Sequence, residues 1–201
     1  MIEVPFLSYQ DLKLRAADVL RSSSCGDQIP VNIELIVERD YDIEIVPIPG
    51  LQTAYGIDAF ISNDLATITV DESVLENRIN RYRFSLAHEL GHRVLHQGIF
   101  SKIEFASITE WKDFAVSIPA KEYGYLEYQA NTFANALLVP QVNLQDEFDK
   151  SIELVRQAGL DPYEARDVCL DSISTHLGKT FQVSSTVMSL RIEKDGLFDQ
   201  L

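Results

Sequence analysis

The chain has 201 residues, of which 46% are hydrophobic and 24% are charged. This composition is typical of a globular protein that buries an ordinary core, and it excludes disordered, collagen-like and coiled-coil chains. The formal charge of −14 repels phosphate groups, so general binding to nucleic acid or to anionic membranes is disfavoured. The length suits one domain, and we expect that domain to span residues 1–201.

Cysteine usage and the first residues predict the compartment. Cys25 and Cys169 stand in no metal-binding or redox spacing, and they cannot form a disulfide framework. Residues 1–5 lack the basic and apolar regions of a signal peptide, and no apolar run approaches the ~20 residues of a membrane span. We therefore expect a soluble protein of the reducing cytoplasm without a membrane partner.

The first third of the chain predicts two helices and a small sheet. Apolar spacing indicates a helix over residues 8–21 and, after Pro30, a second helix over about 31–40. Runs rich in β-branched residues predict three strands, at residues 43–47, 59–61 and 66–70. Residues 62–64, Ser-Asn-Asp, have turn chemistry, so the last two strands should form a hairpin.

The rest of the chain predicts mostly helix. One long helical stretch is expected from Val74 to His96, stopped by Gly98, and another over residues 125–139, ended by Pro140. Residues 99–122 show no clear period, and they fit either a functional loop or a short element that packs their aromatic side chains. Three more helical segments, broken at Gly159 and Gly178, are expected at residues 143–158, 162–177 and 184–192.

Residues 88–92, His-Glu-Leu-Gly-His, fit the pattern H-E-x-x-H. Histidines four residues apart lie one turn apart on one helix face, so His88 and His92 can bind one cation. Glu89 points to the neighbouring sector and can reach a water on that cation without binding the metal itself. The alternative is that both histidines satisfy ordinary hydrogen bonds in the core. Gly91 between them would let a neighbouring element approach closely.

A catalytic zinc site needs a third protein ligand. His96 lies about 80° round the helix from His88, so we place it behind the ligands or in the core. Glu127 is a better candidate, because it is a carboxylate on an otherwise apolar predicted helix. Asn131, one turn later, is suited to accept the outer N–H of a metal-bound imidazole. The alternative for Glu127 is a place on a solvent-exposed stripe.

Two segments of the chain resemble the ImmA/IrrE-type metallo-endopeptidases. The first is residues 83–92, RFSLAHELGH, followed by Leu95 and His96. The second is residues 127–140, EYQANTFANALLVP, which is similar to the family signature E-x-x-A-N-x-F-A-x-x-L-L-M-P, with Val139 in place of the usual methionine. The run VSSTVMSLR at 183–191 is a weaker match to the family's ending.

The resemblance implies a zincin-like α+β fold, mostly helical, with a small, about three-stranded sheet packed on the active-site helix. The single metallopeptidase domain would then hold the N-terminal helices and sheet in residues 1–72, the two ligand helices in 73–140 and a helical region in 141–201. We expect residues 99–122 to form one wall of the cleft, because they join the two ligand helices.

The resemblance also implies a zinc ion held by His88, His92 and Glu127, with Glu89 as catalytic acid and base, and no other cofactor. The reaction would be hydrolysis of a peptide bond. Its developing oxyanion needs a further donor. The candidates, left unranked, are Tyr123, Tyr125, Tyr128 and His96.

Three functions compete at this point. The first is a zinc endopeptidase acting on a specific protein, which the resemblance implies to be a helix-turn-helix transcriptional repressor of a mobile element or stress-response circuit. Nothing before Pro30 looks long enough for such a motif, so that repressor would be a separate chain. The second is a non-hydrolytic zinc-containing regulator, such as an antirepressor or a toxin–antitoxin component. The third is a DNA-binding module, against which the net charge argues. The oligomeric state stays open.

Overall fold

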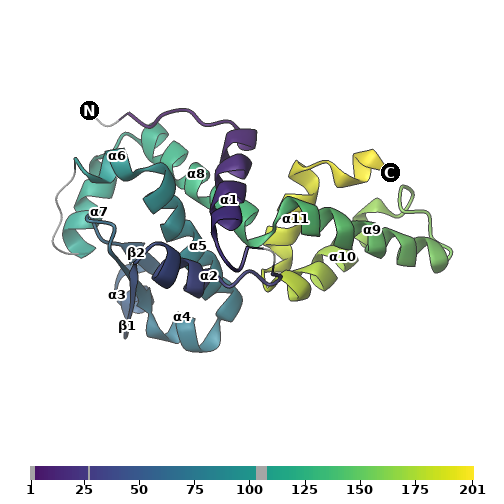
Figure 1. Cartoon of the computed structure of the whole chain (residues 1–201), viewed down its shortest axis with the longest axis horizontal. Helices are drawn as coiled ribbons and strands as arrows, with labels where there is room; N and C mark the ends of the chain where they lie inside the picture. The colour runs from purple at the N-terminus through teal and green to yellow at the C-terminus, as the bar shows by residue number, and fades with distance from the viewer. Residues whose placement is uncertain (1–2, 27, 103–107) are drawn as a thin grey trace.

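The computed structural model describes residues 3–26, 28–102 and 108–201. Two long helices, α5 (Ile79–Leu95) and α8 (Ala120–Leu138), pack against each other in the middle of the molecule. The sheet lies on one side of them, and the last three long helices extend away on the other side, as Figure 1 shows. This is the mostly helical α+β fold with a small sheet that the sequence predicts.

The first helix, α1 (Tyr9–Ser22), begins where the sequence predicts it. The hydroxyl of Ser8 accepts the backbone N–H of Asp11 at 3.2 Å, and the Asp11 carboxylate accepts the N–H of Ser8 at 2.9 Å, which is a complete capping box. The second predicted helix is present as α2 (Ile33–Leu35), continued by the π-helical turn η1 (Ile36–Asp40).

The three predicted strands are confirmed as β1 (Glu44–Ile48), β2 (Ala59–Ile61) and β3 (Thr67–Asp71), in the sheet order β1-β3-β2. Strands β2 and β3 form the predicted antiparallel hairpin, whereas β1 runs parallel to β3. A short helix, α3 (Leu51–Tyr55), lies in the connection from β1 to β2. Strand β2 therefore lies at an edge of the sheet, where it packs against α5.

The single long helix expected from Val74 to His96 is wrong. The chain forms α4 (Glu72–Asn77) and then α5, and Arg78 between them leaves the helical conformation with φ −137° and ψ 59°. The side chain of Asp71 caps α4 by accepting the N–H of Val74 at 3.0 Å. No glycine or proline marks the break, so the sequence pattern carries no signal for it.

The predicted end of this helix near His96 is confirmed, but the expected stop signal, Gly98, is wrong. Helix α5 ends at His96, whose φ is −119°, and Gly98 lies inside the short helix α6 (Gln97–Phe100). The ring of His96 is held by buried hydrogen bonds, described below, so tertiary contacts rather than a glycine end this helix. Of the region left open at 99–122, residues 108–117 form a helix, α7 (Ile108–Ser117), while 103–107 with Phe105 lie outside the described residues.

Helix α8 begins five residues before the predicted start at 125, directly after Pro119, and it ends before Pro140 as predicted. It packs closely on α5 at Gly91. A Cβ atom there would lie 3.2 Å from Cα of Ala130 and 3.2 Å from a ring carbon of Phe133. The predicted close approach at Gly91 is therefore confirmed, and it sets the spacing of the two helices that carry the site.

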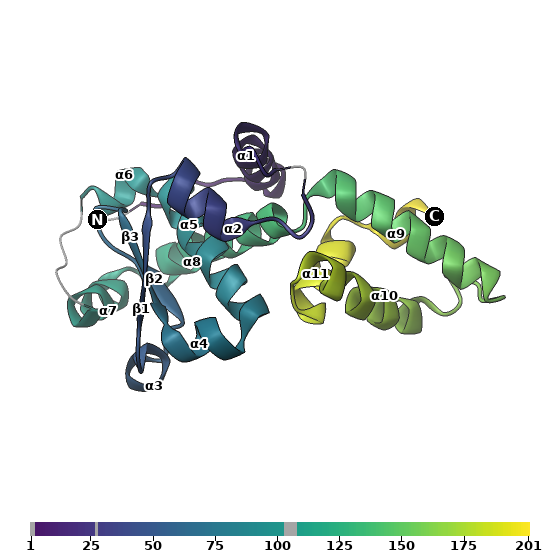
Figure 2. The same cartoon turned by 60° about the horizontal axis from the view of Figure 1, so that its bottom comes forward.

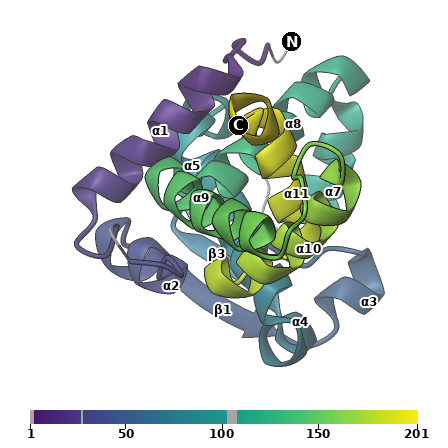
Figure 3. The same ribbon diagram turned by 90° about the vertical axis from the view of Figure 1, so that its right-hand side faces the viewer.

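The C-terminal part consists of α9 (Gln141–Gln157), α10 (Arg166–Phe181), α11 (Ser185–Lys194) and the short 3-10 helix η2 (Leu197–Gln200). Gly159 follows α9 with φ +79°, as expected for a helix end. The expected break at Gly178 is wrong, because Gly178 lies inside α10, where a Cβ atom would meet the carbonyl oxygen of Val183 at 3.0 Å. Figure 2 shows these helices grouped beside the sheet-containing part, and Figure 3 shows them from their own end, in front of it.

A buried polar cluster joins these helices to α1. Asp195 accepts hydrogen bonds from Tyr9 at 2.9 Å and from Lys13 at 2.8 Å, and it lies 2.9 Å from the guanidinium of Arg191. Arg191 also donates to the amide oxygen of Gln141 at 2.9 Å. Because breaking such a buried pair leaves an uncompensated charge, this cluster fixes how the C-terminal helices sit on α1.

Within the described ranges, none of the helices combines the length and the apolar character that a membrane span requires. Cys25 and Cys169 are free thiols, and both are buried.

Candidate metal centre

Helices α5 and α8 bring three possible metal ligands to one point. Nε2 of His88 lies 3.0 Å from Nε2 of His92 and 3.4 Å from Oε2 of Glu127, and Nε2 of His92 lies 3.8 Å from Oε1 of Glu127. A tetrahedral zinc ion with bonds of about 2.05 Å would need ligand atoms about 3.4 Å apart. The three observed separations bracket that value, so the donor set fits a zinc ion without rearrangement of the helices.

The charge distribution around these atoms also fits a cation. Burial lowers the pKa of His88, but its hydrogen bond to Glu127 and the charges of Glu89 and Glu127 outweigh that effect and raise the pKa above the ordinary value. The field at Nε2 of His88 therefore favours positive charge. Burial and the neighbouring rings of His88 and His96 hold the pKa of His92 well below its usual range, so His92 is a neutral ring with a lone pair to offer.

Each imidazole has a partner behind it. Nδ1 of His88 lies 3.1 Å from the side-chain oxygen of Asn131, which is the contact that the sequence analysis expected of Asn131. Nδ1 of His92 lies 3.0 Å from Nδ1 of His96, whose Nε2 in turn lies 3.0 Å from Oε1 of Gln129. His96 is thus placed behind His92 and away from the three converging atoms.

Sequence reasoning missed Gln129. It is only 2% exposed on a helix whose other buried residues are almost all apolar, and it lies two positions after Glu127. A buried amide needs a partner, so the signal was present in the sequence, but only the fold shows that His96 is that partner.

Glu89 is buried beside the three converging atoms. One carboxylate oxygen accepts the backbone N–H of Ile61, in strand β2, at 2.9 Å. Burial raises the pKa of Glu89 to about 7, with Glu127 adding to this effect, and with His88 and the hydrogen bond from Ile61 opposing it. A carboxyl group with a pKa near neutrality is suited to accept a proton and to give it back.

Among the four candidates for the oxyanion donor, Tyr123 is the tyrosine that lines the same cleft as His88 and Glu127. Burial and the nearby Glu127 raise the pKa of Tyr123 to about 12, so its hydroxyl keeps its proton at neutral pH. Tyr125 is exposed and absent from the cleft lining, and Tyr128 lines a separate hollow with Tyr9. Both ring nitrogens of His96 are used in its buried contacts with His92 and Gln129, so His96 has no donor left for an oxyanion.

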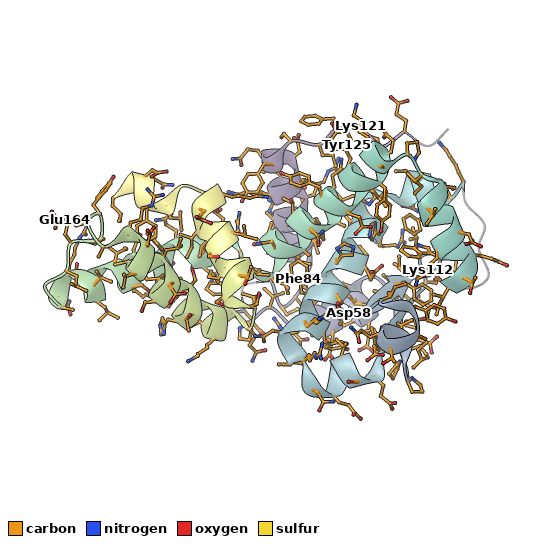
Figure 4. All side chains as sticks on the ribbon, turned by 180° about the vertical axis from the view of Figure 1, so that it is seen from behind. Asp58, Phe84, Lys112, Lys121, Tyr125 and Glu164 are labelled. Atoms are coloured by element: carbon orange, nitrogen blue, oxygen red, sulfur yellow. The ribbon has the colours of Figure 1, made fainter. Side chains whose placement is uncertain are left out.

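The cleft has a volume of about 200 Å³. Apart from the polar residues already named, its walls consist of Gly56 and of the apolar residues Ile57, Ala59, Ile99, Phe100, Trp111, Ile118 and Leu126. Trp111 comes from α7, in agreement with the expectation that the connection between the ligand helices forms a wall. In Figure 4, Lys121 and Tyr125 mark the start of α8, and Asp58, which precedes β2, lies below them.

The buried helix α5 carries two histidines and a glutamate. It faces a carboxylate from a second helix and is backed by a small sheet. This arrangement defines a zincin-like fold with a site that suits a metallopeptidase. The family model for Peptidase M78, described as the IrrE N-terminal-like domain, matches residues 67–193. The chain belongs to this peptidase family. A comparison with curated proteins found no significant match.

Proposed function

We propose that the chain is a zinc-dependent endopeptidase that hydrolyses a peptide bond in one specific protein. The observation that carries the proposal is the convergence of His88, His92 and Glu127 within 4.8 Å of one another, with Glu89 buried beside them. His88, His92 and Glu127 would hold the ion. When bound, zinc supplies Lewis acidity toward the scissile carbonyl and the attacking water.

The protein's own groups perform the proton transfers. Glu89 takes a proton from the attacking water and delivers it to the leaving amine, and its pKa of about 7 suits both steps. The N–H of Ile61 holds one carboxylate oxygen of Glu89 in place. Tyr123, which is protonated at neutral pH, donates a hydrogen bond to the oxyanion that develops on the substrate.

The walls of the cleft support a preference for apolar substrate residues. Ile57, Trp111 and Ile118 line it within the same cavity as the zinc-binding side chains. A polar or charged side chain placed there would lose its hydration without gaining hydrogen bonds from these three residues. We propose that the substrate places an apolar side chain next to the scissile bond.

The proposed substrate is a helix-turn-helix transcriptional repressor in a separate chain of the same cytoplasm. The net charge of −14 supports a basic partner, because DNA-binding proteins carry the opposite charge and opposite charges speed the encounter. The same charge disfavours direct binding of this chain to nucleic acid.

The experiment that tests this function compares the wild-type chain with Glu89→Gln on purified helix-turn-helix repressors from the same organism. The wild type should generate new termini on one repressor, identified by mass spectrometry. Glu89→Gln should bind the same amount of zinc and cleave at least about 100-fold more slowly. Equal cleavage by both would reject the proposal. A stable complex without new termini would instead support the non-hydrolytic regulator.

A further inference from the structure

We infer that His96 and Gln129 are positioning residues that hold His92 in the tautomer whose Nε2 lone pair faces the metal centre, and that the N-terminal segment at Pro5 orients Gln129. The inference rests on the proposed function only where it calls His92 a zinc ligand. The tautomer itself follows from the chain's own hydrogen bonds.

The first step fixes the amide of Gln129. Its side-chain nitrogen donates to the carbonyl oxygen of Pro5 at 2.7 Å. A carbonyl oxygen can only accept, so the NH₂ end of the amide must face Pro5. The oxygen end of Gln129 must therefore face His96, and it lies 3.0 Å from Nε2 of that ring.

The second step assigns the protonated ring nitrogen of His96. The amide oxygen of Gln129 can only accept, so Nε2 of His96 must carry a proton. His96 is 1% exposed, and in the part of the chain that the structure describes no carboxylate hydrogen-bonds to it. A neutral ring with its proton on Nε2 has a lone pair on Nδ1.

The third step assigns the tautomer of His92, at the metal centre. Nδ1 of His92 lies 3.0 Å from Nδ1 of His96, so it must donate the proton to that lone pair. The opposite nitrogen of His92, Nε2, is then unprotonated and points at His88 and Glu127. Without this chain of bonds, the other tautomer would place an N–H where a zinc ion must bind.

Burial makes this chain of bonds effective. Gln129, His96 and His92 are 2%, 1% and 4% exposed, so water cannot replace a lost partner. An unmet polar group at such a place is destabilising, because nothing else can satisfy its hydrogen bond. Asn131, behind His88, is exposed and open to water. The control of tautomer is therefore much stronger for His92 than for His88.

The N-terminal segment is itself fastened to α8. The backbone N–H of Val4 donates to Oε2 of Glu122 at 2.8 Å, and Val4 is part of the buried core. Figure 1 shows the segment, in purple, passing over the region of α8 before it enters α1. The carbonyl of Pro5 is thus a fixed acceptor, and the bonds from it to His92 join the start of the chain to the metal centre.

The direct test is an NMR measurement of the histidine tautomers in the metal-free full-length chain, with ¹⁵N-labelled imidazoles. Two-bond ¹H–¹⁵N correlations distinguish protonated from unprotonated ring nitrogens. In the wild type, His92 should be protonated on Nδ1 alone. In Gln129→Met, which removes both ends of the amide, the two tautomers of His92 should both be populated.

A second measurement uses zinc affinity, determined by competition with a chromophoric chelator. His96→Leu should weaken binding by roughly 10–100-fold, the effect usual for partners behind a zinc ligand. His96→Asn has nearly the same shape as His96→Leu, but its side-chain oxygen takes the place of Nδ1 and can accept from His92, so it should recover most of the affinity. Ile152→Ala, in the core of α9, should lower stability and leave zinc affinity unchanged.

The outcomes separate this inference from the proposed function. A wild type with His92 protonated on Nε2, or equal zinc affinity for wild type, His96→Leu and Gln129→Met, would overturn the inference and leave the peptidase proposal standing. Equal weakening by His96→Leu and His96→Asn would overturn it as well, because packing rather than the hydrogen bond would then be responsible. A confirmed tautomer in a protein that binds zinc but cleaves nothing would support the inference and reject the proposed function.

Discussion

The carboxylate of Glu89 accepts the backbone N–H of Ile61 at 2.9 Å, so the edge strand β2 holds the central side chain of the active-site helix. This hydrogen bond links the sheet to the side chain that we propose as the proton carrier. Burial leaves the charged form of this carboxyl group poorly solvated, so the pKa of Glu89 is raised to about 7 although the bond from Ile61 opposes the rise.

This raised pKa predicts how stability depends on pH in the metal-free protein. In the unfolded chain Glu89 has a pKa near 4.5, and in the folded chain about 7, so the folded state binds the extra proton between these values. The stabilisation from this group is complete below pH 4.5 and is lost as the pH rises through 7. Two and a half pKa units correspond to about 3 kcal/mol.

Glu89→Gln, which cannot ionise, should therefore stabilise the metal-free chain by up to about 3 kcal/mol at pH 8, and the gain should shrink toward pH 5. Chemical denaturation at several pH values checks this. A gain that does not depend on pH would contradict the assignment of the effect to ionisation.

Gly91→Ala should destabilise the chain by about 1–3 kcal/mol, although alanine favours helix, because the new methyl group would lie 3.2 Å from Cα of Ala130 and force α5 and α8 apart. Zinc affinity should fall with it. Gly124→Ala, in the exposed first half of α8 with no atom within 4 Å, is the matched control and should stabilise by about 0.5–1 kcal/mol. Equal stabilisation by both substitutions, measured by urea unfolding, would show that the helices do not approach so closely.

Trp111→Ala should lower kcat/KM for the protein substrate roughly tenfold, which corresponds to about 1.4 kcal/mol, because it removes part of the apolar wall of the cleft. Zinc affinity should not change. Thr109→Ala, an exposed position on the same helix, serves as the control. An unchanged kcat/KM for Trp111→Ala would show that Trp111 of α7 does not contact the substrate.

The acidic surface predicts a salt-dependent association. If the substrate is a basic DNA-binding protein, kcat/KM should fall severalfold as the salt concentration rises from about 0.05 M to about 0.5 M, because screening weakens the attraction. For a short neutral peptide, the same change should have little effect. Identical salt profiles for the protein and the peptide would contradict a role of charge in recognition.

Much of the site could be predicted because its residues are related by short spacings within single helices. Two histidines four residues apart must share a helix face, and the helix period likewise places Asn131 one turn from Glu127. Gln129 and Tyr123 could not be assigned in this way. The partner of Gln129, His96, lies 33 residues away across the α5–α8 contact, and no spacing within a single helix encodes that contact. The role of Tyr123 depends on its place in the cleft lining, which only the fold shows.

The errors in the fold have the same origin. The break at Arg78 was missed because that position carries neither a glycine nor a proline. The end of α5 near His96 was predicted, but buried hydrogen bonds of the His96 ring are found there in place of a stop at Gly98. Gly178 was predicted to end a helix, but it lies inside α10. Its missing side chain makes room for the carbonyl of Val183. The start of α1, which Ser8 caps locally, was predicted to within a residue.

The decisive measurement for a zinc site at His88, His92 and Glu127 is the zinc content of the purified chain, determined by mass spectrometry of the metal after loosely bound ions have been removed. We expect one zinc per wild-type chain and per Glu153→Ala chain, a control at an exposed glutamate of α9. Glu127→Ala should bind zinc with an affinity at least roughly 100-fold lower. A wild type that takes up no zinc when supplied with it, or a Glu127→Ala chain that binds zinc as tightly as the wild type, would show that these three side chains do not form a zinc site.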